Sequence, residues 1–365
     1  MTLSPVVSLL PSRLLGPVRD GKGLLLVASG GLGDNVLLSR VVERFLPLAQ
    51  PGEPVTLLLR KDAAGTAFLF PPSIAIETYD WRKFRRSLRY RWSFGLALRR
   101  HGFRLVVSTD HERHPLVDEL LIACCGCEAL GEEGRPNRKL ADVQRANRRY
   151  FSRLIEAPPA PAHRLRHWVG LANGLCGQNL PMPSLIREPP PAKRDAVVVL
   201  HPFSSDRRRE APPDLFERIL EAIPAGYRIL LSVGPGDLEA RPDWRAFVAR
   251  HQDRIDVDAG PLRAKYATLA TATALVSVDT CLVHLGTLAN LPTFCLCSAA
   301  YQGWSVPYDA DFAPAGTRFY HGDCPQAGCL GQCAYPLRQG CFPCLTDWPE
   351  ERLLDDLRKV LPANP

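Results

Sequence analysis

The sequence predicts an α/β protein built from two doubly wound, Rossmann-like domains that face a central cleft. Continuous apolar runs, typical of buried parallel strands, alternate with helical patterns. This alternation stops at a proline-rich passage, residues 180–191, and then starts again. A length of 365 residues, at about 150 residues per domain, also favours two domains. We therefore divide the chain into residues 1–185 and 186–365.

Each expected element follows from its local pattern. The apolar run Leu24–Ala28 leads into the turn Gly30-Gly31-Leu32-Gly33-Asp34, and apolar residues at helical spacing continue to Pro47. Ligands of such sheets bind beyond the carboxyl ends of the strands. The other expected strands are residues 55–59, 105–108, 196–200, 227–233, 274–278 and 292–296, and the main C-terminal helices are 213–223, 263–271 and 280–290.

Composition indicates a soluble, basic protein. The formal net charge is +7, and no stretch approaches the roughly 20 apolar residues needed to span a bilayer. The N-terminal residues lack the basic start of a secretory signal. Twelve cysteines without such a signal predict reduced thiols and a cytoplasmic location.

The glycine turn in the N-terminal half carries an unexpected carboxylate. Glycines followed by a helix start suit an anion, but Asp34 would repel a phosphate at that place. Asp34 can instead cap the helix, or it can act as a catalytic base facing the cleft. Both roles are open from the residues alone.

Two segments of the C-terminal half suit a diphosphate. A strand ends at Asp279, Thr280 can cap the next helix and His284 lies one turn in, so the amides of residues 280–283 would be free to hold phosphates. The alternative is a capping pair and a packed histidine. The three arginines of residues 207–209 follow another strand end, where they can neutralise a leaving diphosphate or form a solvated charge run.

Together these motifs resemble glycosyltransferase family 9, the heptosyltransferases of lipopolysaccharide core assembly. The resemblance covers roughly residues 24–358. It is carried, in order, by Leu-Gly-Asp at 32–34, His-Pro at 201–202 with a basic loop before Pro212-Pro213, Val-Asp-Thr at 278–280, His284-Leu285 and Pro292-Thr293.

The resemblance implies a GT-B fold, with an acceptor-binding N-terminal domain and a C-terminal domain for a nucleotide sugar, typically ADP-heptose. It implies inversion at the anomeric carbon, with no metal and no cofactor. Asp34 would be the general base, and Gly33, Arg60 and Lys61 would contact the acceptor. The residues implied for donor binding are Arg209, Asp237, Asp279, Thr280, Leu282 and His284.

Three residues depart from the family pattern. Phe203 and Cys281 stand where glycine is common, and Ala211 stands where tryptophan is expected. A cysteine beside the phosphates would narrow the donor pocket. The departures therefore bear on the identity of the donor and on whether activity is retained.

A basic stretch dominates the charge of the chain. Residues 60–104 hold 11 basic and 3 acidic residues, and aromatics alternate with arginines at residues 81–92. Such a stretch suits an anionic membrane surface or a nucleic acid, or it is a solvated helix face. Given the resemblance, we expect an anionic glycolipid acceptor, peripheral contact with the inner membrane and no nucleic acid.

The remaining cysteines divide into two groups. Cys124, Cys125 and Cys127 are expected in the core of an apolar helix. The C-terminal cysteines 324, 329, 333, 341 and 344 have irregular spacing, of which only the pair at 341 and 344 is typical of a metal knuckle. The sequence is compatible with two roles for these five cysteines, as structural thiols or as ligands of a metal.

Two other functions are alternatives to the inverting glycosyltransferase. One is a nucleic-acid-binding module with a cysteine metal knuckle, suggested by the basic stretch. The other is a non-catalytic relative with the GT-B fold, suggested by the departures at residues 203, 211 and 281.

Overall fold

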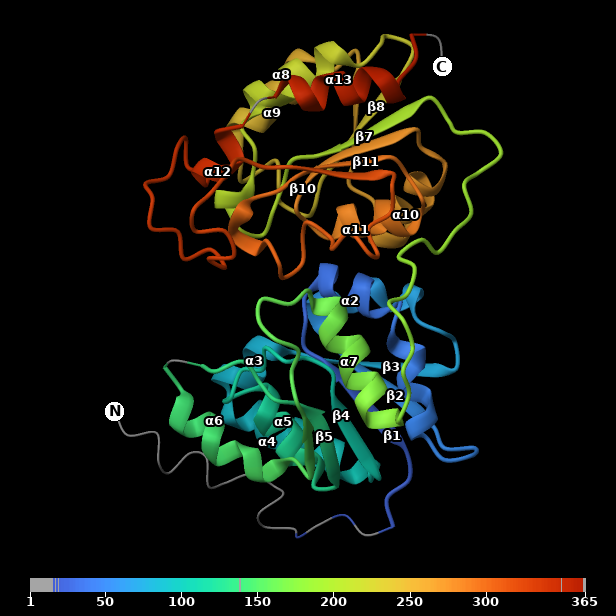
Figure 1. Ribbon diagram of the computed structural model, residues 1–365, viewed down its shortest axis with the longest axis vertical. Helices are drawn as coiled ribbons and strands as arrows, with labels where there is room; N and C mark the ends of the chain where they lie inside the picture. Colours follow the sequence, from blue (N-terminus) through green and yellow to red (C-terminus); the bar gives the residue numbers. More distant parts are fainter. Residues whose placement is uncertain (1–15, 17, 19, 138, 349, 364–365) are drawn as a thin grey trace. The chain divides into compact units, whose positions relative to one another are not determined.

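The computed structural model describes residues 16, 18, 20–137, 139–348 and 350–363. The chain divides into two compact units, residues 1–182 and 183–365 (Figure 1). No helix in the described ranges is long and apolar enough to cross a membrane.

The N-terminal unit is built on a six-stranded parallel sheet of order β3-β2-β1-β4-β5-β6. Its strands are β1 (Leu24–Ala28), β2 (Val55–Arg60), β3 (Ile74–Tyr79), β4 (Leu105–Ser108), β5 (Glu128–Glu132) and β6 (Arg153–Ile155). Its helices are α2 (Leu32–Leu38), α3 (Trp81–Arg86), α4 (Leu88–His101), α5 (Asp118–Cys125), α6 (Ala141–Asn147) and α7 (Arg164–Cys176), with 3-10 turns η2 (Val42–Leu48), η3 (Lys61–Leu69) and η4 (Arg148–Tyr150).

The C-terminal unit repeats this plan, with the parallel order β12-β11-β10-β7-β8-β9. Its strands are β7 (Val197–His201), β8 (Arg228–Ser232), β9 (Ile255–Asp258), β10 (Ala274–Val278), β11 (Thr293–Leu296) and β12 (Thr317–Tyr320). Its helices are α8 (Pro213–Ala222), α9 (Pro242–Arg250), α10 (Leu262–Thr271), α11 (Cys281–Leu288), α12 (Pro343–Thr346) and α13 (Glu351–Val360), with 3-10 turns η5 (Arg207–Arg209) and η6 (Ala299–Tyr301).

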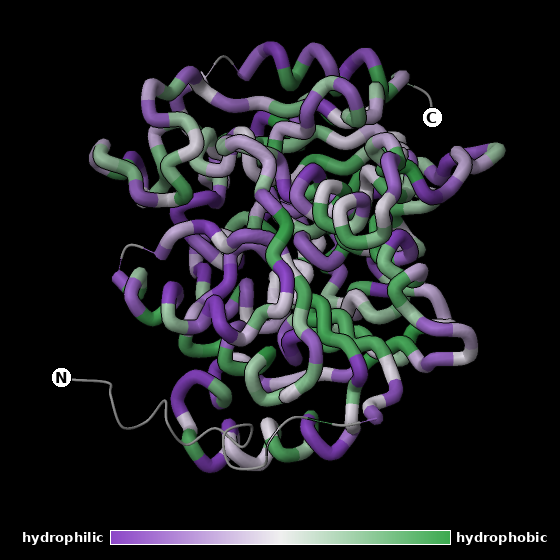
Figure 2. Tube along the Cα trace, turned by 60° about the horizontal axis from the view of Figure 1, so that its bottom comes forward, coloured by the Kyte–Doolittle hydropathy of each residue, from purple (hydrophilic) through white to green (hydrophobic). Residues whose placement is uncertain are grey.

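Helices cover both faces of each sheet, which explains why the strands are apolar throughout. In the C-terminal unit α8, α9 and α13 pack on one face, and α10 and α11 lie on the other (Figure 1). All five residues of β1 and all five of β10 are buried, as expected for parallel strands covered on two sides. The hydrophobic stretches run through the interior of each unit (Figure 2).

The doubly wound fold predicted from the sequence is confirmed. The apolar runs at residues 24–28, 105–108 and 274–278 are strands with the expected bounds. Two expectations about the N-terminal helices are wrong. The helix expected to continue to Pro47 ends at Leu38, and a 3-10 turn contains the proline, which cannot donate to an α-helical ladder. Cys127 lies beyond α5, because Gly126 ends that helix in the left-handed conformation.

Each sheet contains one point where the chain reverses its direction of winding. In the N-terminal unit β1 leads outward to β2 and β3, and β4 leads the other way to β5 and β6. The same reversal separates β7 from β10 in the C-terminal unit. Loops that leave two such strands diverge, which opens a place for a ligand at the carboxyl edge.

Gly286 fixes the distance between α11 and its sheet. A Cβ atom at this position would lie 2.7 Å from Thr293 Oγ1 and 2.8 Å from Leu275 Cδ2, and both side chains are fully buried. We expect Gly286→Ala to lower the free energy of unfolding by about 1–3 kcal/mol, because overpacking forces the helix from the sheet. Denaturant titration measures this effect.

Gly170 provides the matched control. It also lies within a helix, α7, but it is exposed and a Cβ atom there has open space. Gly170→Ala should raise the free energy of unfolding by about 0.5–1 kcal/mol, since alanine favours the helix. Equal effects of the two substitutions would show that close packing at Gly286 does not matter.

Candidate active site

In the N-terminal unit, a buried carboxylate joins the two strands at the reversal. Asp110 follows β4 and accepts a hydrogen bond from the backbone N–H of Ser29, which follows β1, at 2.5 Å. Burial raises the pKa of Asp110 to about 7, with Arg164 opposing this shift. The sequence pattern missed Asp110, because a single aspartate after a strand carries no recognisable motif.

Asp34 lies next to this point, at the start of α2. Gly31 is the residue that precedes the helix, so the prediction that Asp34 could be the cap residue is wrong in detail. Asp34 is the third residue of the helix, and its Oδ2 atom accepts from the Gly31 N–H at 2.8 Å. A side chain on Gly30 would collide with Asp34, so only glycine allows this approach.

The second oxygen of Asp34 has a different partner. Oδ1 lies 3.0 Å from Nε of Arg164, the first residue of α7, and neither side chain is more than a quarter exposed. Arg164 also donates to Glu112 Oε2 at 2.8 Å. One arginine therefore orients two carboxylates, and Asp34 both stabilises the helix start and presents a partly exposed oxygen.

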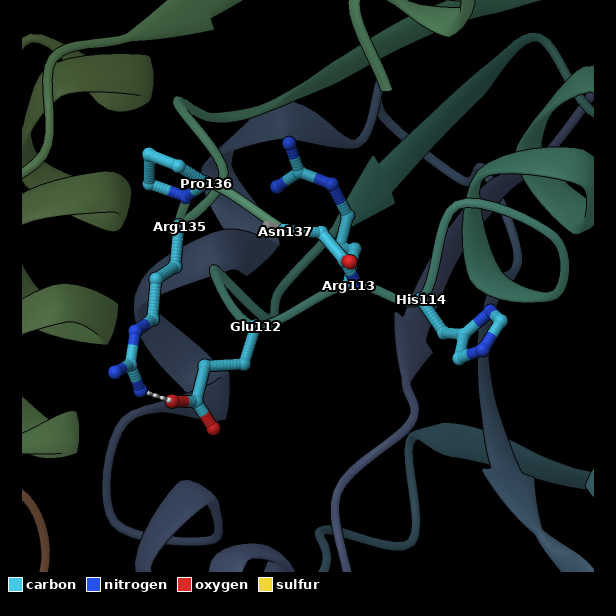
Figure 3. A pocket seen from close by; sticks show the side chains of 6 residues that line it. All are labelled: Glu112, Arg113, His114, Arg135, Pro136 and Asn137. Carbon is cyan, nitrogen blue, oxygen red and sulfur yellow. Dashed lines mark hydrogen bonds and ion pairs between the residues drawn. The ribbon is translucent and has the colours of Figure 1, made fainter. Parts of the chain in front are cut away.

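A small pocket extends from Glu112. Arg135 donates to Glu112 Oε1 at 2.8 Å across it (Figure 3). Glu112 also contacts Arg164, which in turn contacts Asp34. Hydrogen bonds and ion pairs therefore connect the pocket with the Asp34 site. The lining residues are Glu112, Arg113, His114, Arg135, Pro136 and Asn137.

A chain of buried polar groups continues on the other side of Ser29. Its hydroxyl lies 2.9 Å from the Tyr79 hydroxyl, which donates to Asp118 Oδ1 at 3.3 Å. Trp81 Nε1 donates to the same oxygen at 3.1 Å. Burial raises the pKa of both Tyr79 and Asp118. No sequence motif indicated this network, whose members come from three separate stretches of the chain.

The structure places the predicted acceptor residues on three elements, α2, β2 and η3. Gly33 lies in the first turn of α2, next to Asp34. Arg60 ends β2, where its guanidinium donates to Asp62 and lies 5.4 Å from the ring of Trp81. Lys61 is exposed at the start of η3. Trp81 thus links Arg60 to the buried network, whereas Lys61 lies at the surface.

In the C-terminal unit, the structure brings together two of the predicted donor residues. Arg209, from the loop after β7, donates to the backbone carbonyl of Asp279, after β10, at 3.3 Å. Its Nη1 atom lies 3.7 Å from Asp279 Oδ2, and its guanidinium stacks over Tyr301. Ser298 also donates to Asp279 Oδ2 at 3.2 Å. Burial raises the pKa of Asp279 to about 7, with Arg209 opposing this shift.

The helix start beside this pair is ordered by backbone geometry. Thr280 precedes α11 in an extended conformation, but its side chain does not cap the helix, contrary to the expectation. Leu282 is buried within the first turn. His284 is also buried, and its Nδ1 atom lies 2.6 Å from the Tyr308 hydroxyl. Tyr308 therefore fixes the imidazole, which the motif alone could not show.

Both oxygens of the Asp237 carboxylate accept hydrogen bonds from residues close to it in the chain. Oδ2 accepts from the Gly234 N–H at 2.6 Å, and Oδ1 accepts from Arg241 at 2.9 Å. Asp34 contacts Gly31 in the same way, three residues back. Asp237 is thus first a turn-forming residue, and any ribose contact would use its remaining acceptor capacity.

Two further basic groups lie at this edge: Lys265, which sequence reasoning missed, and His201, which belongs to the His-Pro motif but had no assigned role. Lys265 of α10 is buried and donates to Ser232 Oγ at 2.8 Å and to the Asp258 carbonyl at 2.6 Å. His201 ends β7 and bonds the Ser232 carbonyl through Nδ1 at 2.8 Å, and burial lowers its pKa to about 4. The sequence around Lys265, in the middle of a helix, does not indicate that its hydrogen-bond partners lie on strands.

Two of the three departures from the family pattern lie in the core. Phe203 packs edge-on against Trp244 at 5.2 Å between ring centroids, and Ala211 is 1% exposed in the same apolar cluster. Cys281 is the first residue of α11, and burial raises its pKa to about 12. Only Cys281 therefore lies at the expected phosphate site.

The C-terminal cysteines do not act as one group. Four of them pack around Ala299 and Phe342, and the Cys341 thiol donates to the Gln339 carbonyl at 3.7 Å. Cys341 and Cys344, the pair with knuckle spacing, therefore differ in their contacts. The four are Cys324, Cys329, Cys333 and Cys344.

No family model matches this sequence, and no curated protein matches it. Solved structures do match. A glycosyltransferase family 9 protein from Veillonella parvula has a TM-score of 0.66 at 13% identity, covering 95% of this chain and 98% of that one. E. coli ADP-heptose LPS heptosyltransferase II has a TM-score of 0.62 at 15% identity, covering 93% and 98%.

A third match has a ligand. The E. coli heptosyltransferase WaaC with ADP has a TM-score of 0.60 at 16% identity, covering 93% of this chain and 98% of that one. At identities this low, the matches establish the fold but not the activity. The activity has to be argued from the site. The chain has the GT-B fold of these heptosyltransferases, as its ordered motifs predict.

Proposed function

We propose that the protein is an inverting glycosyltransferase that moves a sugar from a nucleotide diphosphate donor to an acceptor hydroxyl. The contact of Arg209 with Asp279 at the start of α11 carries this proposal. It places a partly buried cation beside a helix N-terminus, the combination that stabilises a leaving diphosphate. The reversal point in the C-terminal sheet is where such folds bind ligands.

The N-terminal unit supplies the base in this proposal. Asp34 would take the proton of the acceptor hydroxyl as its oxygen attacks the anomeric carbon of the donor. The bond from that carbon to the diphosphate then breaks, and the electron pair leaves with the phosphate oxygen. Attack from the side opposite the leaving group inverts the anomeric carbon. Arg164 orients Asp34 through its contact at 3.0 Å.

The positive charge needed by the leaving group comes from the chain. Arg209 offers a guanidinium, and the first turn of α11 offers amides with the positive end of the helix dipole. We therefore propose that transfer needs no metal. The likeness to heptosyltransferases supports ADP-heptose as the donor and a glycan of the lipopolysaccharide core as the acceptor.

The basic stretch supports an anionic glycolipid as acceptor and peripheral contact with the inner membrane from the cytoplasm. Arg82, Lys83, Arg85 and Arg86 of α3 are all exposed. Two apolar side chains follow on α4, with Leu88 55% exposed and Trp92 39% exposed. Exposed cations with apolar neighbours are typical of helices at an anionic lipid surface. Arg91 and Arg99 are buried and belong to the fold instead.

A thermal-shift panel tests the donor class directly. The protein is heated with ADP-, UDP-, GDP- and CMP-sugars, and the donor should raise the unfolding temperature while the other nucleotides should not. Transfer to lipopolysaccharide core acceptors is then measured with that donor. Absence of a shift with every nucleotide sugar would reject the proposed function.

Asp34→Asn should abolish transfer while donor binding stays unchanged. The amide oxygen can still accept from the Gly31 N–H, so the helix start is preserved. Loss of the base should lower the rate at least a hundredfold. The measurements are turnover and the donor's thermal shift. Turnover at the wild-type rate would show that Asp34 only stabilises α2.

Donor affinity should fall about tenfold between pH 6 and pH 8. Since the pKa of Asp279 is raised to about 7, the residue is neutral below that pH and Arg209 is free for the diphosphate. Above it the carboxylate is charged, repels the diphosphate and competes for Arg209. Calorimetric titration with an ADP-sugar, whose diphosphate does not titrate in this range, measures the effect.

Two variants provide controls for this pH dependence. Asp279→Asn should remove it, because the amide stays neutral throughout. Asp110→Asn removes the other buried carboxyl with a pKa near 7 and should leave the dependence of donor binding intact. The interpretation fails if Asp279→Asn binds donor with the wild-type pH profile.

Replacing the four exposed basic residues of α3 by glutamine should weaken binding to vesicles of anionic lipid by about a hundredfold or more, since each contributes about 1 kcal/mol near such a surface. Vesicle flotation measures this. The control replaces four other exposed arginines of the same unit, with the same change in net charge. Equal loss in both variants would indicate a general charge effect. The control residues are Arg145, Arg148, Arg149 and Arg153.

A further inference from the structure

Three side chains that can bind a metal meet inside the N-terminal unit. His111 follows β4, Glu132 ends β5 and His167 lies in α7. All three are buried, with exposed fractions of 5%, 1% and 4%. Each offers a ligand atom within 4.8 Å of the ligand atoms of the other two. Their separation along the chain explains why no sequence spacing indicates them.

The hydrogen bonding of His167 uses one of its two ring nitrogens. Its Nδ1 atom lies 2.9 Å from Glu132 Oε2, which leaves Nε2 for another partner. This buried Nε2 atom and the buried Glu132 Oε1 atom have no hydrogen-bond partner among the described residues. Buried polar atoms normally have one, so both atoms point to a ligand.

His111 completes the cluster. Its ring stacks on that of His167 with 3.7 Å between centroids and 4° between planes. The backbone of His111 is fixed as well, since its carbonyl accepts from the Arg135 N–H at 3.0 Å.

The nearby arginines do not neutralise Glu132. Arg113 donates to the backbone carbonyl of Glu132 at 2.8 Å, but its guanidinium lies 3.7 Å from the carboxylate of Glu119. Arg164 is held by Asp34 and Glu112. Each cation thus has an ion-pair partner other than the Glu132 carboxylate.

We propose that His111, Glu132 and His167 bind a divalent transition-metal ion of the zinc class. Two imidazoles and one carboxylate form a ligand set that zinc accepts, with a fourth position for water. Ligand atoms at zinc distances lie about 3.4 Å apart, so the two imidazole rings must turn out of their parallel stack for both nitrogens to face one ion. The ion would tie the loop after β4 and strand β5 to α7, whose first residue is Arg164. Its role is structural and separate from the transfer reaction.

The test begins with the full-length wild-type protein. After treatment with a chelator and addition of zinc alone, we expect one equivalent per chain with nitrogen and oxygen ligands, and a higher unfolding temperature than without zinc. Cobalt loading followed by X-ray absorption identifies the ligands. This measurement separates the cluster from the cysteines, which would supply sulfur.

Variants assign the ion to these residues. His111→Gln and His167→Gln should each lose the nitrogen- and oxygen-bound equivalent. His114→Gln is the matched control, because it changes a histidine of the same loop outside the cluster, and it should keep the ion. The proposal is overturned if the wild-type protein binds no zinc or binds it only through sulfur, or if folded His167→Gln keeps the nitrogen-bound ion. If the variants do not fold, the wild-type ligand spectrum still decides.

Discussion

The reversal of winding in each parallel sheet is the constraint on which the rest of the structure depends. Strands β1 and β4 are neighbours, yet the chain leaves them in opposite directions, and β7 and β10 repeat this arrangement. Only at these two points do the loops that leave adjacent strands diverge. Polar side chains can therefore gather there, since no helix covers these strand ends. The contact of Asp110 with Ser29 spans one reversal, and that of Arg209 with Asp279 spans the other.

The two reversal points contain similar groups, but they differ in the sign of the charge that dominates. Each contains a buried aspartate whose pKa is raised to about 7 and which faces an arginine. In the N-terminal unit Arg164 is shared between Asp34 and Glu112, so carboxylates dominate and a base is supported. In the C-terminal unit Arg209 and the start of α11 dominate, which favours an anion. The proposed division between base and donor follows from this difference.

The sequence predicts the scaffold better than the site. Runs buried on both faces, such as residues 24–28 and 274–278, identify their strands because burial alone sets their composition. Strands such as β9 and β6, with exposed or polar residues, show no such run. Motif order indicated Asp279, which follows β10 directly, and Arg209, which lies in the η5 turn after β7. Arg164 and Lys265 lie on helices, and only the packing of those helices brings them to the strand ends.

The central claim is that a nucleotide diphosphate binds at the C-terminal reversal point. A crystal structure of the protein with an ADP-sugar tests it most directly. The account predicts phosphate oxygens within hydrogen-bond distance of the Arg209 guanidinium and of the amides in the first turn of α11. A diphosphate bound at the N-terminal reversal point, against Asp34 and Asp110, would contradict it.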